Sequence, residues 1–188
     1  MSMEQIGQRL RRYRRAAGKT LLEVATEAGL SAGFLSQAER NLSGLSITSL
    51  AAIAKALNVP LRLLIDQPPQ PSPDSHAGQR LRYSTSDRGQ SYERLSSSFP
   101  GSQINAVKMT LPVGYESEEV AHGGDEFAYV LSGCVRYRIA GVDYLLRSGD
   151  SLHFDSRQLH LLANAGEQTA EIVSVGTLAI FDDTPATP

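Results

Sequence analysis

The chain has 188 residues, of which 41% are hydrophobic, and a formal net charge of −2. This length allows one large domain or two small ones, each with its own core. The lone cysteine, Cys134, excludes an internal disulfide and a cysteine-rich zinc site. The opening stretch "MSMEQIGQRLRRYRR" has no apolar signal region, and no run of about 18 apolar residues follows, so we expect a soluble cytoplasmic protein with no membrane contact.

Charge is distributed unevenly along the chain. Residues 1–66 hold nine basic and five acidic residues, whereas residues 67–188 hold nine basic and fifteen acidic ones. Between the halves, "DQPPQPSPDSH" (66–76) has four prolines in eleven residues, which favours an extended spacer. We therefore expect a basic domain over residues 1–66 that could meet a polyanion, a linker over 67–77 and an acidic domain over 78–188.

The first half has a helical pattern. Apolar residues recur with helical period at Ile6, Leu10 and Tyr13. Pro60 suits the first turn of a short last helix, because its missing N–H is not needed there. The sequence predicts five helices in the first 65 residues, with N-terminal caps at Thr20 (in a capping box with Glu23), Ser31 and Ser46.

Residues 20–40, "TLLEVATEAGLSAGFLSQAER", indicate a helix, a tight turn at "AGLS" and a second helix. Together with "SITSLAAIAKALNVPL", this stretch resembles the lambda-repressor-like (XRE) helix-turn-helix family over residues 5–66. The chain lacks the glycine and the proline that the family usually has near Asn41 and Leu45, so the loop there can differ. The alternative interpretation of this half is a helical protein-interaction module.

The resemblance implies that the second helix enters the major groove of DNA. Gln37 is the strongest candidate for reading a base, because its amide can both donate to and accept from an adenine edge. Glu39 would be repelled by DNA, and we expect it to bridge to a basic neighbour inside the domain. The predicted DNA contacts are Lys19, Thr20, Ala32, Gly33, Ser36, Gln37 and Arg40, of which Lys19, Thr20 and Arg40 are placed for the phosphate backbone.

After the linker the hydrophobic period becomes two, as in "CVRYRI". Short runs such as "INAVKMTL", "EFAYVL", "VDYLL", "SLHF" and "AEIVSVGTLAIF" are separated by turn residues, and no helical pattern intervenes. This spacing indicates an antiparallel barrel or sandwich. Alternation further predicts that Ala128 and Val130 share the inward face of Glu126.

Two motifs in this half resemble the metal-binding cupin family over residues 100–181. In "GYESEEVAHGGDEFAYVLSG", His122 and Glu126 fall at family positions, but Val120 stands where the family has the first histidine of its pair. In "GDSLHFDSRQLHLLAN", His160 and Asn164 fall at family positions. The fold expected is therefore α+β in two domains, a five-helix lambda-repressor-like domain followed by an antiparallel double-stranded β-helix of the cupin type.

The cupin resemblance implies a site built from His122, Glu126 and His160. Two imidazoles and a carboxylate can hold a divalent iron, manganese, nickel or zinc ion, and alternation favours Glu118 as a fourth ligand. The same three residues could instead pair with one another or bind an organic effector, and both alternatives stay open. The predicted effector pocket adds Val120, Ala128, Arg138 and Asn164.

The two halves together resemble transcriptional regulators in which a helix-turn-helix is followed by a cupin sensor. This implies a homodimer that binds a DNA operator, most simply as a repressor, and that responds to a small-molecule effector. The alternative is a mononuclear-iron enzyme that resembles a hydroxyalkylphosphonate epoxidase, in which the helical domain is repurposed and supplies a lysine, here Lys19, to the site.

Overall fold

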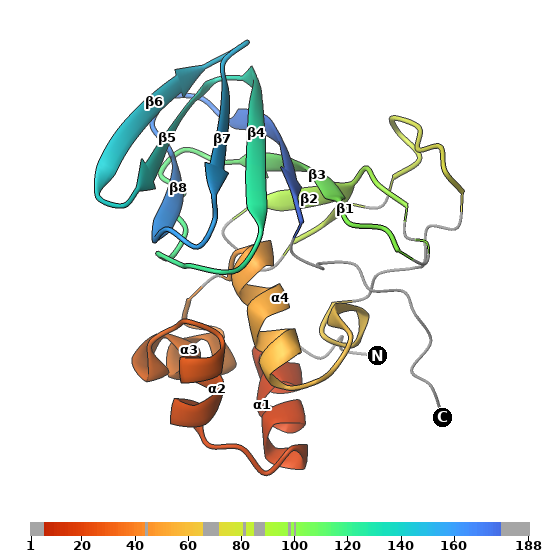
Figure 1. Ribbon diagram of the computed structural model, residues 1–188, viewed down its shortest axis with the longest axis vertical. Coiled ribbons are helices and arrows are strands. Elements are labelled where there is room, and N and C mark those ends of the chain that lie inside the picture. The colour runs from red at the N-terminus through yellow and green to blue at the C-terminus, as the bar shows by residue number, and fades with distance from the viewer. Residues whose placement is uncertain are drawn as a thin grey trace.

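The structure is a computed structural model that describes residues 6–43, 45–65, 72–80, 82–84, 89–97, 99 and 101–177. Figure 1 shows a helical part and a strand-built part stacked along the longest axis of the molecule. Helix α4 (Ile47–Ala56) extends from the helical part towards the strands. Residues 67–71 of the predicted linker lie outside the described residues, and the domain boundaries at 66 and 78 stay predictions.

The helical part contains four α-helices among the described residues, so the expectation of five α-helices was wrong. The predicted fifth is a single 3-10 turn, Leu61–Leu63, with backbone bonds from Leu63 N to the Pro60 carbonyl and from Leu64 N to the Leu61 carbonyl. The segment after Pro60 is too short to build a ladder of i to i−4 hydrogen bonds. The other three helices are α1 (Ile6–Ala16), α2 (Leu21–Glu27) and α3 (Ala32–Glu39).

The predicted caps begin these helices. Thr20 accepts a hydrogen bond from the Glu23 N–H while the Glu23 carboxylate accepts one from the Thr20 N–H, which completes the capping box. The Ser31 side chain accepts from the Phe34 N–H, and the Ser46 side chain accepts from the Ser49 N–H. Each cap satisfies a backbone donor that a helix N-terminus would otherwise leave without a partner.

A buried ion pair joins α1 to α3. The guanidinium of Arg14 donates to both carboxylate oxygens of Glu39 at 2.6 and 2.9 Å and also to the Lys19 carbonyl. The side chains of Arg14 and Glu39 are only 13% and 6% exposed. The prediction that Glu39 bridges to a basic neighbour is confirmed, and Arg14 therefore supports the domain's structure.

Replacing Glu39 with glutamine should lower the free energy of unfolding by about 3 kcal/mol, because the Arg14 charge stays buried without its counter-ion. Urea unfolding of the full chain measures this change. Glu27→Gln is the matched control, since Glu27 is 48% exposed in its pair with Lys19, and such a pair contributes about 1 kcal/mol at most. Equal losses in the two variants would contradict a structural role specific to the buried pair.

The strands form two antiparallel sheets, as the alternating pattern predicted. One sheet has the order β1-β2-β3-β9-β4-β7 and the other the order β6-β5-β8. Their strands are β1 (Arg82–Tyr83), β2 (Ser91–Arg94), β3 (Asn105–Leu111), β4 (Asp125–Ser132), β5 (Cys134–Ile139), β6 (Val142–Arg147), β7 (Ser151–Asp155), β8 (His160–Asn164) and β9 (Ala170–Gly176).

Some strands differ from the sequence pattern. β8 (His160–Asn164) is buried at every position, so it shows no alternation that could reveal it. β1 has only two residues and β2 four, too few to set a period. The predicted last strand continued to Phe181, but β9 ends at Gly176 and residues 178–181 lie outside the described residues.

Inward and outward faces on β4 follow the prediction. Ala128 and Val130 are 2% and 0% exposed, whereas the intervening Tyr129 is 40% exposed. The inward side chains meet those of the second sheet, such as Val135 and Tyr137 on β5, to form the barrel core. Among the described residues, the helices are too short and too polar for any of them to cross a membrane.

Candidate functional site

His122, Glu126 and His160 converge, as the motifs predicted. The ligand atoms of the three side chains all lie within 4.8 Å of one another. Glu126 Oε1 is 2.9 Å from His122 Nε2 and 3.8 Å from His160 Nε2. The three side chains are 8%, 14% and 6% exposed for His122, Glu126 and His160 respectively, so the cluster is nearly closed to solvent.

Backbone hydrogen bonds fix the positions of these residues. Glu126 lies on β4 and His160 begins β8, while His122 belongs to the segment of residues 112–124 that connects β3 to β4. In that segment Val120 exchanges two backbone hydrogen bonds of 2.9 Å with His160, and the His122 N–H donates to the Ser156 carbonyl. Residues separated by nearly forty positions are thereby brought side by side.

The second ring nitrogen of each histidine faces a backbone carbonyl. His160 Nδ1 is 2.8 Å from the Gln158 carbonyl, which leaves Nε2 as the nitrogen directed at the cluster. His122 Nδ1 is 3.3 Å from the Gly123 carbonyl. Burial by itself lowers the pKa of His122, but the adjacent Glu126 carboxylate and this carbonyl outweigh burial, and the pKa is raised above its ordinary value.

The arrangement fits a divalent metal. His122 Nε2 is buried and makes no hydrogen bond of ordinary geometry, although Glu126 Oε1 lies 2.9 Å away. A buried imidazole nitrogen that faces a carboxylate and a second imidazole matches the nitrogen and oxygen donors that first-row divalent metals take. Val120, which replaces the first family histidine, is 6% exposed, lines the cavity described next and supplies no donor side chain.

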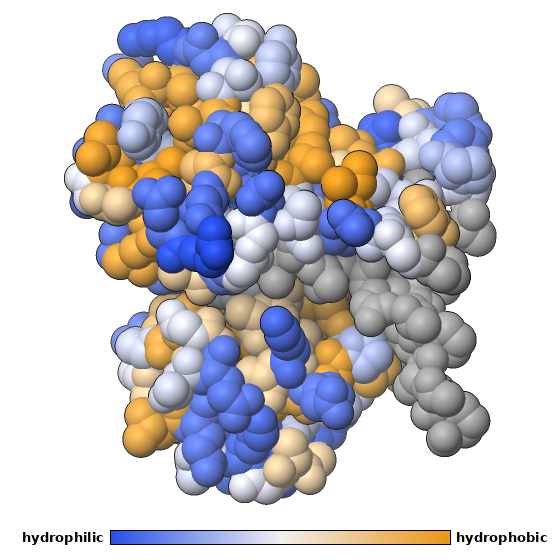
Figure 2. Space-filling model, in the orientation of Figure 1, coloured by the Kyte–Doolittle hydropathy of each residue, from blue (hydrophilic) through white to orange (hydrophobic). Residues whose placement is uncertain are grey.

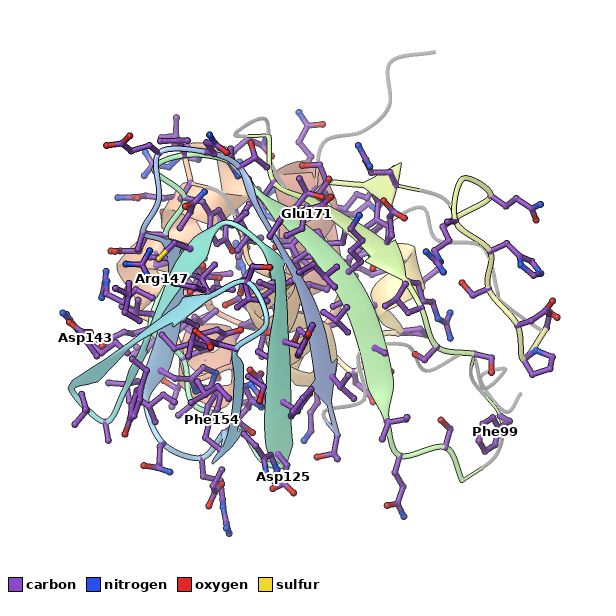
Figure 3. The ribbon with its side chains drawn as sticks, turned by 90° about the horizontal axis from the view of Figure 1, so that it is seen from above. Phe99, Asp125, Asp143, Arg147, Phe154 and Glu171 are labelled. Atoms are coloured by element: carbon purple, nitrogen blue, oxygen red, sulfur yellow. The ribbon has the colours of Figure 1, made fainter. Side chains whose placement is uncertain are left out.

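A small cavity of about 40 Å³ adjoins this cluster. Glu126, His160 and Val120 line it, together with Tyr137 of β5 and Ser174 of β9. Phe154 of β7, which is labelled in Figure 3, meets the His160 ring edge-on with centroids 5.0 Å apart. The cavity wall is therefore mostly apolar, with a few hydroxyl, imidazole and carboxylate groups, as in many small-molecule sites.

Sequence reasoning missed part of this wall. Tyr137 could have been found, because it alternates with the inward Val135 and Ile139 of β5. Ser46, Ile47 and Thr48 from the N-terminal end of α4 also line the cavity, although they belong to the other half of the chain. Nothing in the sequence signals that contribution, because it depends on how the two halves pack.

The structure does not place Glu118 beside His122, Glu126 and His160. Glu118, Val120 and His122 are less exposed than the intervening Glu119 and Ala121, so the expected alternation holds in this segment although it is no regular strand. The Glu118 carboxylate instead accepts hydrogen bonds from the backbone N–H and the hydroxyl of Ser46, both at 2.9 Å. A fourth ligand at Glu118 stays a prediction, since in this structure the carboxylate is bound to the start of α4.

Three of the four residues predicted for the effector pocket do not line the cavity. Arg138 alternates with inward neighbours on β5, points outward and pairs with Asp143, which Figure 3 labels at the outer edge of the barrel. The hydrogen bond from Arg138 lowers the pKa of Asp143 to about 2. Asn164 is buried, but its side-chain amide donates to the carbonyls of Leu111, Pro112 and Gln168, which is a structural role. Ala128 is buried on the inward face without lining the cavity.

Most of the predicted DNA contacts lie on the accessible side of the helical part. Gly33, Gln37 and Arg40 are exposed and Ser36 is half-buried on or directly after α3, whereas Leu35 and Ala38 are buried in the core. Figure 2 shows hydrophilic residues over much of the visible face of the helical part. The helix therefore presents one polar side to solvent, as a groove-binding helix must.

Three of the predicted contacts have other roles as well. Thr20 caps α2, and Ala32 is half-buried against the core. The Lys19 ammonium donates to both oxygens of Glu27 and to the Ala56 carbonyl, at 2.7 to 2.9 Å. Lys19 would have to leave these partners before it could contact a phosphate.

Comparison with known proteins supports the two-part organisation. A helix-turn-helix family model matches residues 10–64, and a cupin-domain model matches residues 107–176. The HTH-type transcriptional regulator SutR of Escherichia coli (strain K12) is 28% identical over 171 residues, which cover 88% of this chain and 90% of SutR. The chain thus aligns with this regulator across both parts.

Solved structures show the same fold. An HTH_3 family transcriptional regulator from Vibrio cholerae has a TM-score of 0.60 at 24% identity, over 92% of this chain and 94% of that one. Hydroxypropylphosphonic acid epoxidase from S. wedmorenis has a TM-score of 0.48 at 18% identity, over 90% and 95%, a similarity too weak to support an argument about activity. The chain therefore has a helix-turn-helix domain followed by a cupin domain, and in both parts and their order it is similar to the transcriptional regulator SutR.

Proposed function

We propose that the protein binds a specific DNA operator as a homodimer and represses transcription until a small-molecule effector enters the cupin barrel. The observation that carries the DNA-binding proposal is α3, a capped helix after a tight turn that exposes Gly33, Gln37 and Arg40. A helix held in this way can insert its exposed side chains into the major groove. A dimer would place two such helices on half-sites about one helical turn apart.

DNA selected from a random pool by the full chain would supply the operator for the test. The expected result is tight binding of the selected duplex, with an affinity that falls steeply as salt rises, because phosphate contacts release counter-ions. A scrambled duplex of the same length should bind far more weakly. Binding that does not distinguish the two duplexes would contradict a sequence-specific regulator.

Replacing Gln37 with alanine should cost about 1–3 kcal/mol at the cognate base pair and relax the preference for it. The reason is the loss of an amide that can make two hydrogen bonds to one adenine edge. Fluorescence anisotropy with the selected operator and its single-base variants measures this. Gln8→Ala is the matched control, since Gln8 is an exposed glutamine on a different helix, α1. An unchanged preference at every position in Gln37→Ala would overturn its assignment as a base reader.

In the barrel, we propose that His122, Glu126 and His160 hold a divalent metal beside the effector. Their two imidazoles, one carboxylate and near-complete burial support this assignment. The donor set suits iron, manganese, nickel or zinc without selecting among them. Such an ion would offer open coordination positions to oxygen atoms of an effector, while Tyr137 and Ser174 line the adjoining space.

The position of Lys19 argues against the epoxidase-like alternative. Its ammonium is bound to the carbonyl of Ala56, at the C-terminal end of α4, whereas the cavity lies at the opposite end of that helix. A helix of ten residues is about 15 Å long. Lys19 therefore does not reach the cavity of its own chain. Metal-dependent turnover of a small substrate by the purified protein would favour the enzyme instead.

A further inference from the structure

One short segment of the barrel touches both the metal cluster and the helical part. Within residues 112–124, Glu118 binds the start of α4, with its carboxylate 2.9 Å from both the N–H and the hydroxyl of Ser46. A carboxylate is favoured there by the partial positive charge of the helix N-terminus. Four residues later in the same segment, His122 belongs to the metal cluster.

The same segment also lies against the turn between α2 and α3. A β-carbon added at Gly29 would be 3.3 Å from the carbonyl oxygen of Ala121, the residue directly before His122. Gly29 has a φ of 69°, which ends α2 and sets the direction of α3. Glu118, Ala121 and His122 thus connect α4, the turn before the recognition helix and the cluster within five residues of chain.

The N-terminal end of α4 also lies against the cavity. Ser46, Ile47 and Thr48 form part of its wall, and Ile47 is only 2% exposed. The volume of about 40 Å³ holds a few waters or an ion. Sites for organic ligands are typically about 300–1,000 Å³. With α4 in this position, the cavity is therefore smaller than such a site.

We propose that the α4 N-terminus is a lid on the cupin cavity, anchored by Glu118, and that an effector acts by displacing it together with the DNA-binding helices. This mechanism rests on the proposed function, because it names how the same cavity controls DNA binding. α4 contacts α2, and α2 in turn contacts α3, so displacement of α4 would be passed through α2 to the recognition helix α3. Occupation of the cavity and the closed lid exclude each other sterically.

Thiol labelling of the full chain tests whether the lid is anchored as described. Ile47→Cys in a Cys134→Ser background places a reporter beneath the lid. Replacing Glu118 with glutamine removes the anchoring charge and should raise the labelling rate of that cysteine at least ten-fold. Glu119→Gln, at an exposed neighbour of Glu118, is the matched control and should leave the rate unchanged. Ile53→Cys on the same helix reports unfolding instead, since Ile53 is 0% exposed and does not line the cavity.

A cavity-filling substitution imitates an effector without requiring its identity. Ser174→Leu places a larger side chain on the cavity wall and should also accelerate labelling of the cysteine at position 47, with Ser174→Val as the smaller variant if the first unfolds. Both Glu118→Gln and the filled cavity should weaken binding to the selected operator at least ten-fold. The reason is that the two helical parts of the proposed dimer, once loosened from their barrels, are no longer held at the half-site spacing. Binding to a scrambled duplex should not change.

The outcomes separate this mechanism from the proposed function. If the wild type binds no DNA selectively, the regulator proposal fails, whatever the labelling rates are. If operator binding is selective but Glu118→Gln labels at the wild-type rate, or binds the operator with unchanged affinity, the lid mechanism is overturned. Faster labelling at both position 47 and position 53 would indicate unfolding and would also overturn it. Unchanged metal content in Glu118→Gln is expected, since Glu118 is not a ligand.

Discussion

Replacing His160 with alanine should abolish stoichiometric metal binding, and replacing Val120 with histidine should strengthen it. His160 Nε2 is one of two imidazole donors in the cluster, and loss of a direct ligand should lower metal affinity by more than the roughly 100-fold that a disturbed outer partner can cost. Val120 lines the cavity beside His160 and occupies the family's missing histidine position. An imidazole there would complete a four-ligand set, with a gain of at least about 100-fold.

Elemental analysis of protein purified without a metal-affinity tag or a chelator measures the first effect, and competition with a metal-binding dye measures the second. His153→Ala is the matched control, because the His153 side chain is 65% exposed and lies outside the cluster. We expect near one metal per chain in the wild type and in the control, and none in His122→Ala/His160→Ala. Wild-type protein that stays metal-free after anaerobic addition of iron, manganese, nickel and zinc would leave an organic-ligand cavity without a metal.

Replacing Gly7 with alanine should strongly destabilise the helical part. A β-carbon at this position would lie 2.3 Å from the Ala38 carbonyl oxygen and 2.8 Å from that of Glu39, so α1 could not stay against the end of α3. The Gly7 N–H would also lose its 3.0 Å bond to the Asn41 side chain. We expect a loss of about 3 kcal/mol in the free energy of unfolding, at the upper end for overpacking, and with it the loss of operator binding.

Gly33→Ala is the control for this substitution. Gly33 is exposed on α3, and its added β-carbon would meet only the Ser31 hydroxyl oxygen at 4.0 Å. Alanine is the better helix former by about 1 kcal/mol, so stability should be unchanged or slightly increased. Urea unfolding followed by circular dichroism compares the two variants. A Gly7→Ala chain as stable as the wild type would show that the packing of α1 on α3 adjusts more easily than the contact distances imply.

In the helical part, sequence patterns correctly predicted the features that depend only on interactions between neighbouring residues. Thr20, Ser31 and Ser46 begin helices because each side chain bonds a backbone N–H three residues further on, an interaction that the sequence spacing specifies. Asn41, two residues after the end of α3, has a φ of 58°, in the left-handed region that asparagine adopts more readily than most residues. The prediction of a fifth α-helix was wrong. The described residues that follow Pro60 form a single 3-10 turn, which helix propensity alone does not distinguish from an α-helix.

Alternation along the chain predicted which side chains point inward, but not which groups those side chains contact. On β4 it placed Ala128 and Val130 inward because pairing on both sides holds the strand flat. It did not identify the partner of Glu118, which is half-buried beside the exposed Glu119 but whose carboxylate binds Ser46. It was not applied to Arg138, whose outward position follows directly from its place between Tyr137 and Ile139.

The sequence by itself determined the two folds and the caps, because caps and strand period are set by neighbouring residues, and its resemblance to the cupin motifs identified the His122, Glu126 and His160 cluster. Only the tertiary structure decided that Glu118 binds Ser46 and that α4 lines the cavity. Those contacts join residues more than seventy positions apart across two halves of different period. Their geometry depends on the packing of whole surfaces, which no local pattern encodes.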